Sequence, residues 1–305
     1  SSRRSATSSM STRGIAVSAP AKINLYLGVH TLKDERGYHR VDSVMAALDL
    51  VDTLTFDAAD ELSVELVPAI DLPQEKNSVY RAARMLGEAF GREPSFRITV
   101  KKRIPLRAGL GGPSADAAAA LVGLCRLWGI EQTDARVIEI ARSLGADVPF
   151  FLHGPLAYCA GAGDELAEPM EPLAGLPVVL VQPAGAGVTA AEAYARFDAD
   201  PVPVPPLEEL LEALRAGDAD AVPALIANNL APAACAAEPA IEDVVSWLRA
   251  QPGVRAAQVT GSGSCSFAIC AAVADARSIA AAARTHGWWA CAATMEKSGP
   301  TVTEC

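Results

Sequence analysis

The feature that most constrains this chain is a glycine-rich loop that leads directly into a helix, IPLRAGLGGPSADAAAAL at residues 104–121. A strand-forming stretch, SFRITVKKRIP, comes before it, and the alanine run after Pro113 favours a helix. Backbone N–H groups at a helix start form an anion site together with the helix dipole, and glycines let a phosphate approach the chain closely. The loop therefore predicts phosphate binding, with the Ser114 hydroxyl as a ligand for a phosphate or its metal ion.

The loop matches neither of two widespread phosphate-binding patterns. No lysine follows the glycines, as the Walker pattern requires, and Ser114 stands where the dinucleotide pattern needs its last glycine. A tight strand-to-helix turn of purely structural use therefore stays open. If the loop does bind phosphate, the positive charge has to come from another part of the chain.

Charge and composition narrow the classes of partner. The chain has 305 residues and a net charge of −10, which argues against a broad basic surface for nucleic acid or anionic lipid. No apolar segment reaches the roughly 20 residues that span a bilayer, so we expect no membrane partner. The seven cysteines include no C-x-x-C pair, which favours reduced thiols in the cytoplasm over disulfides or zinc. Residues 1–13 are Ser- and Arg-rich, and we expect a disordered leader with Met10 as a possible true start.

Hydrophobic periodicity predicts strands and helices in mixed order. In the first part of the chain, strands are expected at 15–29 (broken at Pro20), 41–56, 61–68 and 95–105, and helices at 77–90, 113–128 and 133–144, the last with Thr133 as its N-cap. Residues 145–170 are expected to form a short connection followed by a hairpin.

The second part begins near the Pro-rich segment 172–177. We expect a strand at 178–183, two or three helices between 207 and 250, strands at 254–261, 264–273 and 288–295 with a glycine turn and an alanine-rich helix between them, and a loose tail. This mixed order favours an α+β fold in two domains, 14–173 and 174–305.

Three stretches together resemble the ordered motifs of the GHMP kinases. They are PAKINLYL at 20–27, the glycine loop at 104–121, and QVTGSGSCSFAIC at 258–270. The resemblance runs from about residue 15 to about residue 294. It implies an N-terminal domain like ribosomal protein S5 domain 2, a ferredoxin-like C-terminal domain, and a cleft between them for ATP and Mg²⁺. The family usually reads G-L-G-G-G-S-S-D-A-A, so Pro113 removes one N–H and Ala115 one hydroxyl from this loop.

Within that superfamily, GYHRVDSVMAALDLVDTL and GADVPFFLHGPLAYCAGAGD are similar to one branch. Its members phosphorylate the 2-hydroxyl of a methylerythritol that carries a cytidine diphosphate, in the non-mevalonate isoprenoid pathway. The resemblance therefore implies a small-molecule kinase that acts on a cytidine-diphosphate-linked polyol. Sister kinases that act on homoserine, mevalonate or a sugar, and an inactive nucleotide-binding regulatory module, remain alternatives. The sequence leaves a monomer and a homodimer equally open.

The resemblance supplies Lys22 and Asp147 as the catalytic pair. Strand alternation sends Lys22 and Asn24 to one face, and the apolar VPFF run after Asp147 indicates that this carboxylate is partly buried. Phosphoryl transfer needs alignment, charge neutralisation and a proton acceptor. Asp147 would accept the proton of the attacking hydroxyl, and Lys22 would hold it ionised. Without the resemblance, a solvent-facing strand lysine and a turn or capping aspartate are the ordinary interpretations.

Further site residues follow from the same resemblance. The predicted ATP-binding residues are Asn77, Lys102, Pro105, Gly109, Leu110, Gly111, Gly112, Ser114 and Ala115, with Ser114 also a metal ligand. The predicted substrate-binding residues are Asn24, Tyr38, His39, Tyr194, Gly261, Gly263 and Ser264. Tyr38 can stack on a pyrimidine and His39 can hydrogen-bond its edge. The alternatives are a turn aromatic and a surface histidine, and a solvated trio at 101–103 that includes Lys102.

Overall fold

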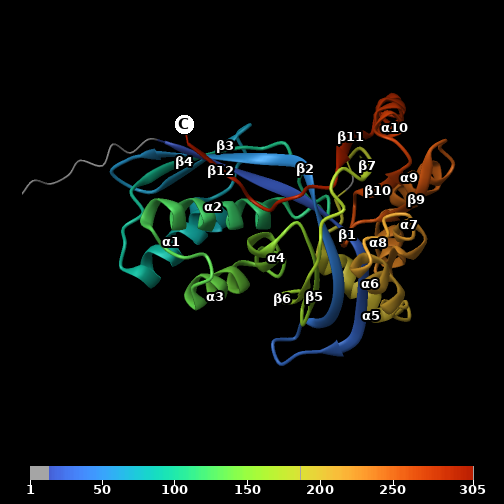
Figure 1. Cartoon of the computed structure of the whole chain (residues 1–305), viewed down its shortest axis with the longest axis horizontal. Coiled ribbons are helices and arrows are strands. Elements are labelled where there is room, and N and C mark those ends of the chain that lie inside the picture. The colour runs from blue at the N-terminus through green and yellow to red at the C-terminus, as the bar shows by residue number, and fades with distance from the viewer. Residues whose placement is uncertain (1–13, 186, 305) are drawn as a thin grey trace, which may run out of the picture.

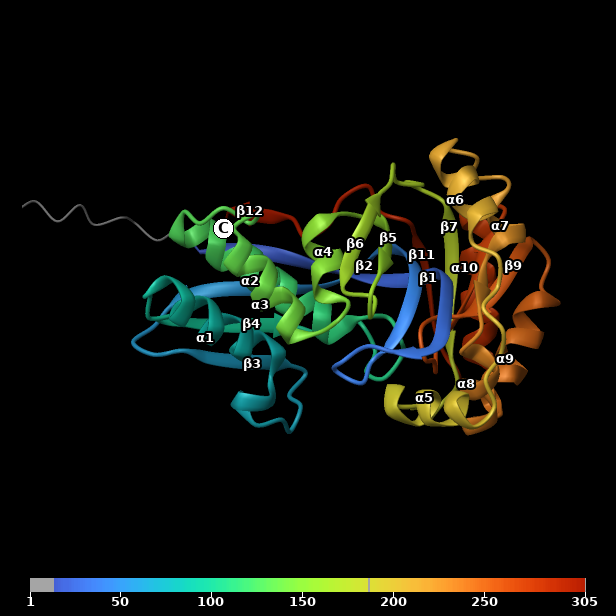
Figure 2. The ribbon, with the colours of Figure 1, turned by 90° about the horizontal axis from the view of Figure 1, so that it is seen from below.

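The computed structural model describes residues 14–185 and 187–304, so the expected leader at 1–13 lies outside the described residues. Figures 1 and 2 show two sheets side by side, each with its own helices. The arrangement is α+β in two parts, as the sequence predicts. Within the described residues, no helix is both long and apolar enough to span a bilayer.

The N-terminal sheet has the strand order β12-β1-β2-β4-β3, and β5, β6 and β8 are attached beside this path. Its strands are β1 (Ile15–Lys33), β2 (His39–Ala58), β3 (Ser63–Val67), β4 (Phe96–Lys101), β5 (Leu156–Ala160), β6 (Glu165–Pro169), β8 (Ala227–Asn228) and β12 (Val302–Glu304). A 3₁₀ turn, Gln74–Lys76, leads into α1 (Ser78–Phe90), and α2 (Gly112–Trp128), α3 (Ala135–Leu144) and α4 (Val148–His153) follow. These helices cover one face of the sheet (Figure 1), with α2 buried along most of its length.

An irregularity at Pro20 decides which side chains of β1 face the helices. Strand β1 continues through Pro20, but its register against β2 shifts between Pro20 and Lys22. Before the shift, Val17 is part of the core under the helices, and after it Ile23 packs in the core on the other face of the sheet. Because side chains alternate along a strand, this shift turns Lys22 and Asn24 toward the helix-covered face.

The C-terminal sheet is antiparallel, with the order β11-β7-β10-β9. Its strands are β7 (Pro177–Gln182), β9 (Val254–Val259), β10 (Ser266–Cys270) and β11 (Trp289–Thr294). The helices of this part are α5 (Ala190–Ala199), α6 (Glu208–Arg215), α7 (Val222–Leu225), α8 (Ala231–Ala237), α9 (Ala240–Arg249) and α10 (Val273–Thr285). The β-α-β-β-α-β succession and this strand order are those of a ferredoxin-like domain.

Both faces of the C-terminal sheet are buried, each against a different layer. Val179 and Val181 share a core with residues of α9 and α10, whereas Leu180 and Phe267 belong to the same apolar core as Ile23 of β1. A shared apolar core therefore holds the two sheets together, because strand alternation sends every second side chain across the boundary. This packing fixes the cleft that opens beside it.

Four local expectations are wrong. Four helices, α6 to α9, lie between residues 207 and 250 instead of two or three. Residues 302–304 are not a loose tail but strand β12, which pairs with Ile15–Val17 and covers the edge of β1. Residues 148–153 form helix α4 instead of a plain connection, with a proline in the first turn. Asp134, not Thr133, is the N-cap of α3, since its side chain accepts the N–H of Arg136.

Candidate active site

A cleft of 260 Å³ lies where the two parts meet the glycine loop. Strands β1 and β2, the glycine loop, the start of α4, the β5–β6 turn, α5 and the β9–β10 turn all contribute to it. Its lining residues are Lys22, Asn24, Leu27, Val41, Ser43, Met45, Gly109, Gly111, Ser114, Ala146, Asp147, Ala162, Gly163, Ala190, Tyr194, Leu230, Gly261 and Ser262.

Lys22 is a buried lysine with two polar partners inside this cleft. Its ammonium donates to Oδ1 of Asn24 at 2.7 Å and lies 3.4 Å from Oδ2 of Asp147. Only 4% of its side chain is exposed, so a solvent-facing strand lysine is excluded. Burial of a charge is costly unless partners compensate it, and Asn24 and Asp147 provide that compensation.

Asp147 stands at the cleft opening, one residue before α4. It occupies the N-cap position, yet its side chain makes no capping hydrogen bond, which leaves the carboxylate for other contacts. Its side chain is 32% exposed, whereas that of Lys22 is nearly enclosed. The pair therefore combines a fixed cation with an acid that a bound molecule can reach.

The glycine loop meets the same cleft. Gly111 is the N-cap of α2 with φ of 73°, a left-handed conformation that glycine adopts without strain. A Cβ on Gly111 would lie 3.0 Å from both the Lys22 and the Phe151 side chains, so these side chains would have to shift to admit a larger residue. The first helical bond runs from the Ala115 N–H to the Gly111 carbonyl. The N–H groups before it have no intrahelical acceptor and can serve an anion.

The β9–β10 turn is bonded to the glycine loop and to β1. The Thr260 hydroxyl accepts the Asn24 N–H at 3.1 Å and lies 3.4 Å from the Gly109 carbonyl. A Cβ on Gly109, whose φ is 74°, would come within 2.3 Å of the Thr260 carbonyl. This approach of two backbones explains why glycines occupy both turns.

Lys102 forms a second buried ion cluster, behind the glycine loop. Its ammonium contacts carboxylate oxygens of Asp52 and of Asp116, the latter at 2.5 Å. Asp52 also accepts the backbone N–H groups of Arg103 and Ile104. Burial raises the pKa of Asp116 to about 7, although the Lys102 charge opposes the shift. Lys102 is thus not part of a solvated trio.

The aromatic residues expected to meet a pyrimidine form a group beside the cleft. The His39 ring stacks on Tyr194 with centroids 5.3 Å apart, and Tyr194 lines the cleft. Nδ1 of His39 donates to the His30 carbonyl at 2.7 Å, and Nε2 lies 3.0 Å from Asp198. His39 is buried and is therefore not a surface histidine, whereas Tyr38 is 60% exposed in a turn.

The predicted residues divide into two sets. Those that line the cleft are Lys22, Asn24, Gly109, Gly111, Ser114, Asp147, Tyr194 and Gly261. Those outside its lining are Tyr38, His39, Asn77, Lys102, Pro105, Leu110, Gly112, Ala115, Gly263 and Ser264. The Asn77 side chain accepts the Val79 N–H and caps α1, and the ATP and substrate roles of this second set stay predictions.

Sequence reasoning missed three polar residues of the site, Ser43, Thr260 and Ser262, of which Ser43 and Ser262 line the cleft. Ser43 accepts a hydrogen bond from the Asn24 amide at 2.9 Å, and Thr260 joins β1 to the glycine loop. Thr260 lies inside the third motif, at 258–270, so the sequence did contain a signal for it. Ser43 carried no local signal, because its importance comes from the pairing of β1 with β2.

Comparison with known families agrees with this architecture. The model of the GHMP kinases N terminal domain matches residues 77–155, and the model of the GHMP kinases C terminal domain matches residues 210–287. The first match contains the glycine loop and Asp147. The second contains most of the C-terminal helices and the β9–β10 turn.

Relatives and solved structures show which branch of the GHMP kinases this chain resembles. A 4-diphosphocytidyl-2-C-methyl-D-erythritol kinase of Paramagnetospirillum magneticum is 38% identical over 90% of this chain and 96% of its own length. One from Salinispora tropica is 39% identical over 88% of this chain and 87% of its own length.

A crystal structure of 4-(cytidine 5'-diphospho)-2C-methyl-D-erythritol kinase aligns with a TM-score of 0.75 at 33% identity, covering 92% of this chain and 99% of that one. A homoserine kinase from Cytophaga hutchinsonii, at 19% identity and a TM-score of 0.71 over 99% of both chains, shares the fold. The chain belongs to the GHMP kinases, and within them to the family of the 4-diphosphocytidyl-2-C-methyl-D-erythritol kinases.

Proposed function

We propose that this protein transfers the γ-phosphoryl group of ATP to the 2-hydroxyl of 4-diphosphocytidyl-2-C-methyl-D-erythritol. The observation that carries the proposal is the Lys22–Asp147 pair, 3.4 Å apart in a cleft that also contains the start of α2. Family membership supports an ATP-dependent kinase, and the relatives' names supply the acceptor.

In the proposed reaction, Asp147 accepts the proton of the attacking hydroxyl. Its partly exposed carboxylate is accessible from the cleft, and the buried ammonium of Lys22 lies 3.4 Å from it. The bond between the hydroxyl oxygen and the γ-phosphorus forms while the bond to the ADP leaving oxygen breaks. Asn24 orients the Lys22 ammonium, which can also stabilise charge on the transferring group.

The glycine loop is the proposed cradle for the ATP phosphates. The N–H groups of Gly111, Gly112 and Ser114 precede the first helical hydrogen bond, and Pro113 contributes none. Lys22 supplies the positive charge that the loop itself lacks. Its aliphatic chain would contact a Cβ placed on Gly111, so the cation stands directly beside the loop.

The residues present fit a Mg²⁺ ion bound mainly through ATP. The described residues contain no cluster of three acidic, His or Cys side chains suited to a metal. Mg²⁺ commonly takes one or two protein oxygens together with phosphates and water, and the Ser114 hydroxyl and Asp147 carboxylate both line the cleft. When bound, Mg²⁺ neutralises phosphate charge during transfer. The free thiols among the described cysteines support the cytoplasm as the proposed location.

The direct test is ATP consumption by the purified protein with three separate acceptors. We expect turnover with 4-diphosphocytidyl-2-C-methyl-D-erythritol and none with homoserine or mevalonate, with phosphate on the tertiary hydroxyl of the product. Turnover only with homoserine or mevalonate would indicate a sister kinase. ATP binding without any turnover would indicate the inactive regulatory module.

A further inference from the structure

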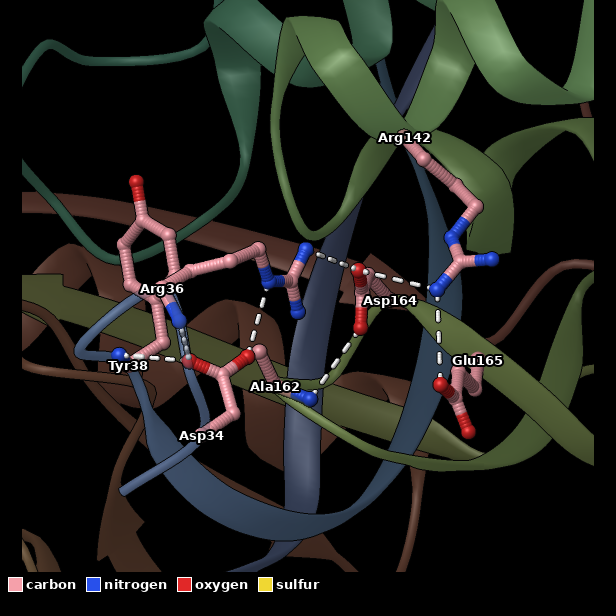
Figure 3. A network of polar contacts seen from close by, with 7 residues as sticks. All are labelled: Asp34, Arg36, Tyr38, Arg142, Ala162, Asp164 and Glu165. Carbon is pink, nitrogen blue, oxygen red and sulfur yellow. Dashed lines mark hydrogen bonds and ion pairs between the residues drawn. The ribbon is translucent and has the colours of Figure 1, made fainter.

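Beside the cleft, a buried aspartate joins three separate segments, as Figure 3 shows. Asp164 is the last residue of the β5–β6 turn, and only 2% of its side chain is exposed. Oδ2 accepts NH1 of Arg36 at 3.0 Å and NH2 of Arg142 at 3.5 Å, and Oδ1 accepts the Ala162 N–H at 3.1 Å. The two guanidinium groups contribute to lowering the pKa of Asp164 although burial opposes this shift. The carboxylate therefore stays charged at neutral pH.

Arg36 belongs to the turn between β1 and β2 and connects that turn to Asp164. Its Nε donates to Asp34 at 2.8 Å while NH1 donates to Asp164, so one planar group bridges two carboxylates. The guanidinium carbon lies 5.4 Å from the centre of the Tyr38 ring. Oδ1 of Asp34 accepts the N–H groups of both Arg36 and Tyr38 at 2.9 Å. Figure 3 shows Tyr38 drawn alongside this arginine.

The β5–β6 turn, to which Arg36 is bonded through Asp164, forms part of the cleft wall. Ala162 and Gly163, the two residues before Asp164, line the cleft. The Gly161 carbonyl accepts the Val41 N–H at 2.8 Å, which holds the β5–β6 turn against β2. Tyr38 itself is outside the lining and exposed. Lys33 and His39, on either side of the turn, contact Asp198 of α5, and the bond from Arg36 to Asp164 ties the turn itself to the β5–β6 turn.

We propose that Asp164 is a positioning residue that, through Arg36, holds Tyr38 at the rim of the cleft to receive the nucleobase of the acceptor. This inference rests on the proposed function, which supplies a nucleoside diphosphate that extends beyond the cleft. Arg36 keeps the Tyr38 ring in one orientation before binding. Pre-ordering of this kind favours affinity, because less freedom is lost when the base stacks.

The test compares Asp164→Asn and Arg36→Ala with a matched control, Arg142→Ala. Arg142 shares the same oxygen of Asp164 but has no contact with the Tyr38 turn among the described residues. For Asp164→Asn and Arg36→Ala we expect the acceptor KM to rise about tenfold, with the ATP KM and kcat little changed. The control should leave all three constants near those of the unaltered protein.

A double-mutant cycle separates positioning from general damage. In a Tyr38→Ala background, Asp164→Asn should raise the acceptor KM no further, because the residue that it positions is gone. Arg36→Lys keeps the positive charge but loses the planar guanidinium that bonds two carboxylates at once. Its affinity for the acceptor should therefore lie between those of Arg36→Ala and the unaltered protein. Equal rises in both KM values, unchanged constants, or additive effects in the cycle would overturn the proposal. Arg36 is half exposed, so Arg36→Ala serves if Asp164→Asn does not fold.

Calorimetric titration of the protein with cytidine 5'-diphosphate, in the absence of ATP, distinguishes the positioning role of Asp164 from the proposed reaction. Normal turnover with no effect of the variants contradicts the positioning role alone. Binding that weakens in Asp164→Asn and in Tyr38→Ala, without turnover of the acceptor, supports the positioning role and contradicts the proposed reaction. If the unaltered protein shows no binding of cytidine 5'-diphosphate and no turnover, both the positioning role and the proposed reaction are contradicted.

Discussion

Two buried lysines in this protein meet aspartates in opposite ways. Lys22 contacts one carboxylate, Asp147, which is partly exposed at the cleft. Lys102 contacts two carboxylates, Asp52 and Asp116, and all three side chains are enclosed. An acid that acts on a bound molecule has to be reachable, whereas one that holds backbone in place does not. We therefore propose that the first cluster takes part in the reaction and that the second supports the glycine loop.

The cluster of Lys102, Asp52 and Asp116 has an energetic cost of burial that the Lys22–Asp147 pair avoids. Two carboxylates share one ammonium, and Oδ1 of Asp116 is buried without a hydrogen-bond partner among the described residues. Asp52 offsets this by accepting two backbone N–H groups just before the loop. A Cβ on Gly112 would lie 3.6 Å from the Lys102 ammonium, so the cluster supports the helix start from behind.

The largest expected effect comes from Asp147→Asn, which should lower kcat about 10²- to 10⁴-fold by removing the proton acceptor. Thermal stability should fall less than in Lys102→Met, since the Asp147 side chain makes no capping hydrogen bond and Asn24 still accepts the buried Lys22 ammonium. The coupled ATP-consumption assay and a thermal unfolding scan measure the two quantities. Asp60→Asn, an exposed site with the same change of charge, is the control. Near-normal turnover in Asp147→Asn would remove the distinction between the two clusters.

Lys102→Met should lower the stability of the protein more than it lowers kcat. It leaves Asp52 and Asp116 buried without their shared cation, which costs about 3–5 kcal/mol in the free energy of unfolding. Urea unfolding at pH 7 measures it, with the exposed Lys101→Met as control. A variant with unchanged stability and lost ATP affinity would instead favour a direct contact between Lys102 and ATP.

The pKa of Asp116 predicts a pH dependence of stability. Burial raises this pKa to about 7, so between about pH 4 and pH 7 the folded protein keeps a proton that the unfolded chain has released. The contribution of Asp116 is thus present at low pH and lost as pH rises through 7. Unfolding free energies over this range should fall more steeply with pH in the unaltered protein than in Asp116→Asn. Parallel curves would contradict the shift.

The smallest effect is expected from Ser43→Ala. The Ser43 hydroxyl accepts the Asn24 amide, and Asn24 in turn accepts the Lys22 ammonium. Loss of this orienting bond should cost about 1 kcal/mol, or a few-fold in kcat. Steady-state kinetics checks it, and an unchanged kcat would show that Lys22 is held by Asp147 alone.

Much of the fold and part of the site were predictable from the sequence. Helices 78–90 and 112–128 follow the expected periodicity and glycine signals, and the strand alternation that sends Lys22 and Asn24 to one face is borne out. The short helix α4 was missed because an apolar run such as VPFFLH has too few turns to reveal a period. Strand β12 was missed because its partner, Ile15–Val17, lies at the other end of the chain.

The motifs, the family that they indicate and the residue types that phosphoryl transfer needs can all be read from the order of amino acids. Which charged groups are enclosed and which stay accessible depends on how the folded chain packs. Asp164 and Arg36 are 128 positions apart, and Asn24 and Thr260 are 236 apart. Such contacts leave no local periodicity, because they arise when sheets pack and a strand shifts its register at Pro20. Burial, and with it the role of each lysine, is a property of that packing.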